Sequence, residues 1–386
     1  MLDWAESGIP ALTGFPDGPA LIPPGSAATV ARRHTDRITA ITGGRVRLDG
    51  ARLLSERAAF TGLGRGGTRS VGRHCRLLPT ADGWAAVSCA RPDDPVLLAA
   101  LISRDATDDP WPGVTDWLRA HTGAELAERA DLLGLAAGPL APVSADPPQP
   151  LRPRPVRGLR VVDFSALWAG PLCAHLLGLA GARVIKVETP TRPDGARRGE
   201  ADFYELLHGG HESVVLDPGA PRQRRALSEL VASADIVIEA SRPRALAGFG
   251  LDAAAFAAAG GTWISITAHG RSSNRIGFGD DIAATAGLVA RSRGVPVFVG
   301  DAIADPLTGL TAAVLAMSAP ADGSGRLWDI AMSSVVAATL DPGPAITAPI
   351  DESRVSAPSR RTAGGVAPGS GRDTDAVLAE LGVRLR

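Results

Sequence analysis

The stretch LRVVDFSALWAGPLCAHLLGLAGARVIKVE, residues 159–188, predicts a strand, a helix and a second strand in close succession. Residues 159–164 form a short apolar run of strand length. Pro171 suits the first turn of a helix, because its missing N–H would be unpaired there, and leucines follow at helical spacing until Gly181. Residues 183–188 form the second strand. Parallel strands joined by a helix leave a crevice at their carboxyl ends, where the helix N-terminus favours an anion. On topology alone, a plain α/β scaffold without a site is the favoured interpretation.

The alternation of strands and helices continues beyond this stretch and predicts one parallel sheet. Strands are expected at 213–217, 235–239 and 262–267, with helices over about 221–233 and 252–259 between them. No Gly-x-Gly-x-x-Gly sequence opens any of these helices, which argues against a nicotinamide or flavin site. The predicted fold class is α/β: a parallel Rossmann-like sheet with helices on both faces, plus a smaller α+β domain.

Composition divides the chain into units. The region before residue 141 contains a predicted hairpin over 76–88 with an Asp-Gly turn, followed by three helices. Six prolines make the following segment a stiff linker. The expected units are a small α+β domain (1–140), the linker (141–157), a large Rossmann-like domain (158–340), a flexible crossing segment (341–371) and a C-terminal helix (372–386).

The charge and cysteine content narrow the class of protein. The formal net charge is −1 and Lys186 is the only lysine, so nothing indicates a nucleic-acid or membrane surface. The three cysteines have no metal-ligand spacing, which favours a reducing compartment. The N-terminus lacks the basic start and apolar run of a signal peptide, and no stretch has the length and apolarity of a membrane span. We therefore expect a cytoplasmic protein.

The opening stretch resembles the class III CoA-transferases, also called the CaiB/BaiF family, which includes formyl-CoA transferase, carnitine CoA-transferase and α-methylacyl-CoA racemase. The family pattern is an apolar strand ending in Asp, then Ala-Gly-Pro, a helix ending in Gly-Ala, and a strand ending in Ile-Lys-Val-Glu. This chain has these blocks at 161–163, 169–171, 181–182 and 185–188. Further blocks follow in the family's order, at 213–217, 234–243, 249–251, 323–332 and 373–382. The resemblance covers about half of the chain, and it implies that the small domain is rearranged, since it precedes the large domain here.

The resemblance also implies where CoA binds, on loops that follow the strands. The positions carried over by motif are Trp168, Ala169, Leu216, Asp217, Ala240, Ser241, Arg242, Thr267, Ala268 and His269. Ordinary loop structure is the alternative for most of them. Arg242 is the strongest candidate, because a fixed cation near a strand end can bind a phosphate. Thr189 stands where the family usually has an arginine, and Arg192 is the nearest substitute.

By the same resemblance, Asp305 is the nucleophile. It lies in the segment 300–310, where the family has an aspartate before a short turn and an apolar helix. The alternative is a purely structural role, because Asp followed by Pro is a common helix start with Asp as the N-cap. The cap position would also suit the chemistry, since a helix N-terminus favours an ionised carboxylate. Asp301 is the nearest rival.

Three functions follow from the resemblance. The first is a CoA-transferase that acts on an acyl-CoA and a carboxylic acid acceptor through an aspartyl covalent intermediate, with no metal, no tightly bound cofactor and a homodimeric assembly. The second is a 2-methylacyl-CoA racemase or isomerase, although Asp280 stands where the family's racemases have a histidine. The third is a non-catalytic CoA-binding protein, which the altered phosphate-contact positions favour.

Overall fold

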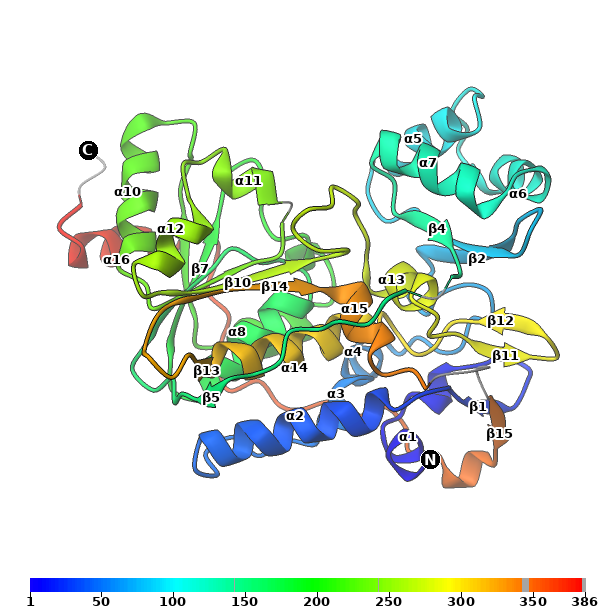
Figure 1. Ribbon diagram of the computed structural model, residues 1–386, viewed down its shortest axis with the longest axis horizontal. Coiled ribbons are helices and arrows are strands. Elements are labelled where there is room, and N and C mark those ends of the chain that lie inside the picture. The colour runs from blue at the N-terminus through cyan, green and yellow to red at the C-terminus, as the bar shows by residue number, and fades with distance from the viewer. Residues whose placement is uncertain (142, 242, 342–346, 384–386) are drawn as a thin grey trace.

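The centre of the molecule is a six-stranded sheet in which every neighbouring pair is parallel (Figure 1). The computed structural model describes residues 1–141, 143–241, 243–341 and 347–383. In chain order the strands are β6 (Arg160–Asp163), β7 (Arg183–Glu188), β8 (Glu212–Val215), β9 (Ile236–Glu239), β10 (Thr262–Thr267) and β14 (Arg326–Ala331). They lie side by side in the order β14-β10-β9-β6-β7-β8. The predicted α/β class is therefore confirmed, and the strand order reverses between β6 and β9, where doubly wound sheets bind their ligands.

Helices cover both faces of this sheet, as the sequence predicts. Figure 1 shows α8 (Ala169–Leu179) and α14 (Ala304–Ala316) on one face, and α10 (Pro221–Ala232), α12 (Ala253–Ala258) and α16 (Thr374–Glu380) on the other. The two faces have separate hydrophobic cores. Both faces of the central strands are buried, which explains why β6 and β9 are continuous apolar runs and not alternating ones.

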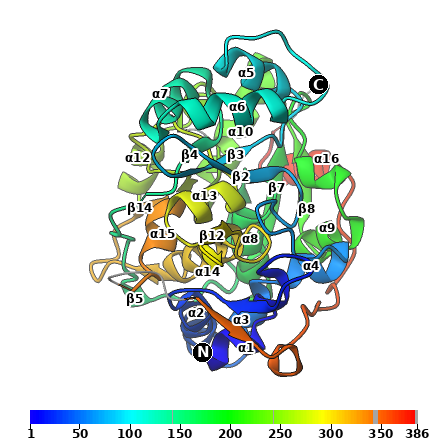
Figure 2. The ribbon, with the colours of Figure 1, turned by 90° about the vertical axis from the view of Figure 1, so that its right-hand side faces the viewer.

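The first sixty residues pack onto the same core as α8 and α14. Their longest element, α2 (Ala27–Ile41), lies against α14 and forms the base of the molecule in Figures 1 and 2. The sequence analysis expected no helix over 27–41, although its buried positions recur at helical spacing. The other elements here are α1 (Leu2–Glu6), a 3₁₀ turn (Pro10–Leu12), β1 (Ala20–Ile22), α3 (Gly50–Leu53) and α4 (Glu56–Thr61).

The predicted hairpin and the three helices after it form a separate layer at the top of Figures 1 and 2. β2 (Cys75–Pro79) pairs with β3 (Trp84–Ser88), and β4 (Ala137–Pro139) joins them in a three-stranded antiparallel sheet. The helices are α5 (Asp94–Leu101), α6 (Trp111–Ala120) and α7 (Gly123–Leu133). These elements have a hydrophobic core of their own. The first 140 residues thus pack in two different ways, and the division of the chain into domains stays a prediction.

Short elements complete the fold. The chain between the large domain and α16 is anchored where β15 (Ala348–Ile350) pairs with β1, and by an ion pair between Arg361 and buried Glu56. None of the described helices is both long and apolar enough to cross a membrane. The remaining elements are β5 (Arg152–Pro153), a 3₁₀ turn (Gly195–Arg198), α9 (Ala201–His208), α11 (Pro243–Ala247), α13 (Gly279–Thr285), β11 (Ala290–Ser292), β12 (Val295–Val297), β13 (Ser318–Ala319), α15 (Met332–Ala337) and a 3₁₀ turn (Glu352–Arg354).

Candidate active site

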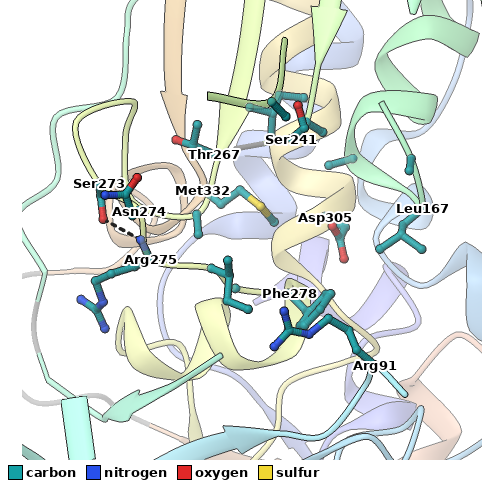
Figure 3. Close-up of a pocket in the computed structure, with 18 of the residues that line it drawn as sticks. Arg91, Leu167, Ser241, Thr267, Ser273, Asn274, Arg275, Phe278, Asp305 and Met332 are labelled. Atoms are coloured by element: carbon teal, nitrogen blue, oxygen red, sulfur yellow. Dashed lines mark hydrogen bonds between the residues drawn. The ribbon is translucent and has the colours of Figure 1, made fainter. Parts of the chain in front are cut away.

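A pocket of about 600 Å³ opens at the carboxyl ends of β6, β9 and β10 (Figure 3). Loop residues that follow these three strands line it, among them Leu167, Ser241 and Ala268. The pocket therefore lies at the reversal of strand order, as expected for a doubly wound sheet. The buried hydroxyl of Ser241 makes no hydrogen bond to any described residue, which leaves it available to a ligand.

Asp305 lies in the first turn of α14 and borders this pocket, where Figure 3 shows its carboxylate facing the open space. The sequence analysis gave Asp305 the N-cap position, and this detail is wrong. The helix begins at Ala304 with Ile303 as its N-cap, so Asp305 is already inside the helix. The reason is the preceding turn, in which Ala302 has a left-handed φ of 46° and accepts a hydrogen bond from the Asp305 N–H at 2.9 Å.

A second pocket, of about 540 Å³, meets the first at Asp305. Its lining combines aromatic side chains, among them Trp168, Phe203 and Tyr204, with charged ones, among them Arg57 and Arg198. Arg91, Leu167, Phe278 and Asp305 border both pockets. One carboxylate thus faces two chambers, and a group bound in either chamber can reach it.

Three further aspartates surround Asp305. Asp280 and Asp281 begin α13, and Asp301 precedes α14. Asp280 accepts a hydrogen bond from the Ala302 N–H at 2.9 Å, and Asp281 accepts one from the Ser88 hydroxyl at 2.7 Å. The four carboxyls are mutually repulsive, so they are not all expected to be charged at neutral pH.

Burial is the largest influence on the ionisation of these groups. It raises the pKa of Asp305 to about 7, and the charges of Asp280 and Asp301 add to the rise while Arg57 opposes it. Burial, with Asp301, raises the pKa of Asp280 to about 6, and burial raises that of Asp281 to about 7. A carboxyl with a pKa near neutrality is available both as a base and as a nucleophile, and such shifts are concentrated at functional sites.

Arg57 on α4 is the cation nearest to this cluster. It forms a two-pronged ion pair with Asp301, in which Nε lies 2.8 Å from Oδ2 and Nη2 binds Oδ1. Its guanidinium also lies over the Trp168 ring, 5.2 Å from the ring centroid. The sequence analysis did not select Arg57, and no local signal identifies it, because 244 residues separate it from Asp301.

The structure places the predicted CoA contacts in different surroundings. Five of them line the first pocket: Ala169, Ala240, Ser241, Thr267 and Ala268. Trp168 lies in the second pocket, and Leu216 is fully buried in the hydrophobic core under α10. Asp217 is exposed and His269 half-buried, and neither lines a pocket. Arg242 lies outside the described residues.

Three arginines border the first pocket. Arg192 is the substitute that the sequence analysis named, and it lines the pocket. Arg91 and Arg275 were not selected, because they come from segments that meet the sheet only in the folded chain. Arg91 forms an ion pair with Asp94 at 2.6 Å, and Arg275 forms one with Asp131 at 3.1 Å. The Arg275–Asp131 pair ties α7 to the loop after β10, and the Arg91–Asp94 pair orients Arg91 at the start of α5.

In the described parts of the chain, no group of three or more His, Cys, Asp or Glu side chains has an arrangement that could hold a metal ion. The contacts that the structure shows for the aspartates at α13 and α14 are hydrogen bonds and the ion pair with Arg57.

Comparison with known proteins gives three findings. A family model described as CoA-transferase family III matches residues 156–369, which contain the whole parallel sheet and Asp305. The chain is 29% identical over 209 residues to succinyl-CoA–D-citramalate CoA-transferase from Chloroflexus aurantiacus, covering 49% of this chain and 52% of the relative. It is 30% identical over 216 residues to succinate–glutarate CoA-transferase from Agrobacterium fabrum, covering 50% and 54%.

Among solved structures, a CaiB/BaiF family protein from Brucella suis is similar, with a TM-score of 0.44 and 28% identity over 48% of this chain and 55% of the other. The chain spans about half the length of the curated relatives that it matches. The matched half contains the sheet, and the first 155 residues lie outside it.

Proposed function

Because the chain belongs to CoA-transferase family III, we propose that it moves CoA from an acyl-CoA thioester to a carboxylic acid, with Asp305 as the nucleophile. The observation that carries the proposal is the position of Asp305 at the boundary of two pockets. A transferase of this kind needs a carboxylate that a thioester can reach from one side and an acid from the other. The relatives support the class of reaction, since their names describe CoA transfer between carboxylic acids.

The proposed reaction balances without a cofactor. The Asp305 carboxylate attacks the thioester carbonyl, the C–S bond breaks, and a mixed anhydride and the CoA thiolate result. The thiolate then attacks the aspartyl carbonyl, which releases the donor acid and leaves an aspartyl-CoA thioester. The acceptor carboxylate attacks this thioester and forms a second anhydride. The thiolate attacks the acyl carbonyl of that anhydride, which gives the new acyl-CoA and restores Asp305.

The two pockets suit the two kinds of substrate. The first lies at the strand ends beside Arg91, Arg192 and Arg275, and we place CoA there because guanidinium groups bind phosphates well. The second has an aromatic lining, and we place the acyl group and the acceptor acid there. Asp305, in the first turn of α14, also gains from the partial positive charge of the helix N-terminus when it ionises.

Exchange of an isotope label between a free carboxylic acid and its CoA thioester tests this proposal. The purified chain is mixed with an acyl-CoA and the matching ¹⁴C-labelled free acid, and label is followed into the thioester. Hydroxylamine is then added, which attacks the carbonyl of the enzyme-bound thioester and releases CoA, and the residue that carries the hydroxamate is found by mass spectrometry. Label in the thioester and a hydroxamate at Asp305 support the proposal. Absence of exchange across a panel of mono- and dicarboxylic acids, or a hydroxamate at another residue, contradicts it.

A racemase or isomerase of 2-methylacyl-CoA is the second candidate, because Asp280 and Asp305 line the same pocket and both have a raised pKa. Such an enzyme needs a base on each face of the α-carbon. Incubation of a 2-methylacyl-CoA in D₂O in the same assay decides between the two. Deuterium at the α-carbon without acid exchange favours the isomerase, and binding of CoA with neither activity favours the non-catalytic alternative.

The assembly is a further proposal. The family resemblance predicts a homodimer, and the C-terminal helix α16 packs beside the edge strand β8, where Asp373 and Thr374 accept hydrogen bonds from the strand's N–H groups. Multi-angle light scattering at micromolar concentration measures the mass directly. A mass near 39.6 kDa would contradict the dimer.

A further inference from the structure

The ion pair between Arg57 and Asp301 joins the N-terminal segment to the loop that carries the proposed nucleophile. Arg57 belongs to α4, outside the region that the family model matches, whereas Asp301 lies four residues before Asp305. Asp301 is 1% exposed, and Arg57 donates to both of its oxygens. A buried carboxylate held in this way has its charge compensated by one specific partner.

We propose that Arg57 is a positioning residue, which neutralises Asp301 and so allows the neighbouring Asp305 to ionise at the pH at which it must attack. The proposal rests on the proposed function, because it assigns Asp305 the nucleophilic step. Arg57 also lines the second pocket, and the role proposed for it is exerted through Asp301 and through space.

The geometry of the turn supports a shared role for these residues. Gly300 and Ala302 both have left-handed φ values, of 65° and 46°, so the chain reverses sharply between Asp301 and Asp305. The Ala302 N–H donates to Asp280 at 2.9 Å, and the Asp305 N–H donates to the Ala302 carbonyl at 2.9 Å. The turn thus places three carboxyls together, and only that of Asp301 is paired with an arginine among the described residues.

The charges explain why the pair matters. Asp280 and Asp301 both disfavour ionisation of Asp305, and Arg57 favours it. Without Arg57, the buried charge of Asp301 would act on Asp305 uncompensated. In a variant that lacks both Arg57 and Asp301, the pKa of Asp305 would change little, because a cation and an anion with opposite effects on it would have been removed together.

Other charged groups face Asp305 across the two pockets. Arg91, Arg192 and Arg275 border the first pocket, and His74, Arg198 and Glu200 border the second. These groups remain in every variant proposed below. Burial raises the pKa of Cys75 and of Tyr204, so both stay neutral over the range of interest. Asp280 and Asp281, whose pKa values burial raises to about 6 and about 7, titrate in the same range as Asp305 and are present in every variant.

A set of variants tests the inference by measuring the ionisation of Asp305 itself. Aspartate labelled with ¹³C at Cγ is incorporated into the full chain, and the Asp305 signal is assigned by its loss in Asp305→Asn. The pKa of this signal is then measured by NMR titration in the wild type, Arg57→Met, Asp301→Asn and the double variant. Met is chosen because it preserves the apolar cover of Trp168.

We expect Arg57→Met to raise the pKa of Asp305 by about one unit or more, and Asp301→Asn to lower it by about one unit. The double variant should return to within about half a unit of the wild type. Arg57→Lys keeps the charge and should shift the pKa less than Arg57→Met does. Arg52→Met is the matched control, because Arg52 lies on neighbouring α3 in a more exposed, looser pair, 3.9 Å from Asp49.

The same variants give a kinetic readout. The rate of acylation is measured by quenching and mass spectrometry at a series of pH values. The pH at which this rate falls on the acid side should shift in each variant by the same amount as the pKa of Asp305. A purely structural role predicts a loss that is equal at all pH values and larger in the double variant than in either single one. That pattern, or a pKa of Asp305 that is unchanged in Arg57→Met, overturns the inference.

The inference and the proposed function can fail separately. If the pKa values follow the cycle but hydroxylamine traps the acyl group on another residue, the proposed nucleophile is wrong and the electrostatic link between Arg57 and Asp305 still stands. If the acyl group is trapped on Asp305 but the double variant does not return toward the wild type, the inference is wrong and the function stands.

Discussion

The chain contains two groups of buried aspartates at the carboxyl side of its sheet, and they are built in opposite ways. The closed cluster is Asp163, Asp194 and Lys186, which lie at the ends of β6 and β7 and in the loop after β7. The open cluster is Asp280, Asp301, Asp305 and Arg57, which lie at the starts of α13 and α14 and on α4. Both clusters pair more carboxyls than cations, but only the second borders a pocket.

In the closed cluster, the ammonium group is enclosed with its partners. Lys186 Nζ lies 2.9 Å from Asp194 and donates to the Ser165 carbonyl at 2.7 Å. Asp194 also accepts hydrogen bonds from the backbone N–H groups of Leu167 and Ala196. Burial alone would raise the pKa of Asp194, but Lys186 and these hydrogen bonds outweigh burial and lower it. At Asp163, 3.9 Å from Lys186 Nζ, burial outweighs the cation and the pKa is raised, but this carboxyl is sealed from both pockets. The cluster fixes the loop that carries Leu167 to the loop after β7.

In the open cluster, the single arginine binds one carboxyl and leaves the others under-compensated. Burial therefore dominates at Asp305, and its pKa rises. The difference teaches that burial by itself does not make a carboxylate reactive. Reactivity requires a carboxyl whose charge is incompletely balanced and which a ligand can reach, whereas a balanced and sealed carboxyl contributes to structure.

The largest expected effect is on chemistry in the open cluster. Asp305→Asn should reduce acyl transfer by at least about 10³-fold, because the covalent route is lost. Circular dichroism and CoA binding should be preserved, since the amide has the same shape. Asp36→Asn, at an exposed position on α2, is the control and should retain full activity. Retention of transferase activity by Asp305→Asn would show that another residue is acylated.

The second effect is on stability in the closed cluster. Lys186→Met should lower the free energy of unfolding by about 3–5 kcal/mol, because it leaves two buried carboxyls without a cation. Urea titration followed by tryptophan fluorescence measures it. Arg183→Met is the control, since the pairs of Arg183 with Glu212 and Glu380 are partly exposed and should be worth about 1 kcal/mol or less. Equal losses of stability in the two variants would show that the buried closed cluster stabilises the fold no more than partly exposed ion pairs do.

The third effect is on CoA affinity at the first pocket. The family resemblance predicts a phosphate contact at Arg242, which lies outside the described residues, so Arg242→Ala should weaken CoA binding by about 1–3 kcal/mol. Ser241→Ala should weaken it by about 1 kcal/mol, because the Ser241 hydroxyl has no partner among the described residues. Isothermal titration calorimetry measures both. Wild-type affinity in both variants would place CoA elsewhere.

The smallest expected effect is an increase in the free energy of unfolding when Asp305 of the open cluster is replaced. The raised pKa of Asp305 means that the folded state binds more protons than the unfolded state between pH 4 and 7, so stability falls as pH rises through this window. Asp305→Asn removes this penalty and should be more stable than the wild type by about 1–2 kcal/mol at pH 7, a discounted figure because Asp305 is partly exposed. The two proteins should converge near pH 4. A difference that is constant between pH 4 and 7 would contradict the raised pKa.

Local pattern predicted much of the fold and part of the candidate site. The βαβ stretch at 159–188 and the alternation after it predicted the parallel sheet, because the spacing of apolar residues reports which faces are buried. The same approach missed α2, because no helix was predicted over 27–41. It also placed Asp305 two positions too early in its helix, since the turn at Ala302 is not visible in the sequence.

The sequence by itself determined the α/β class, the strand ends at which a ligand is expected, and Asp305 as the candidate nucleophile. These features depend on residues that are near one another in the chain. Only the tertiary structure decided that Arg57 binds Asp301 across 244 residues, that Arg91 and Arg275 reach the first pocket, and that a second pocket meets the first at Asp305. The physical reason is that a pKa depends on burial and on charges a few ångströms away, and neither is encoded in local spacing.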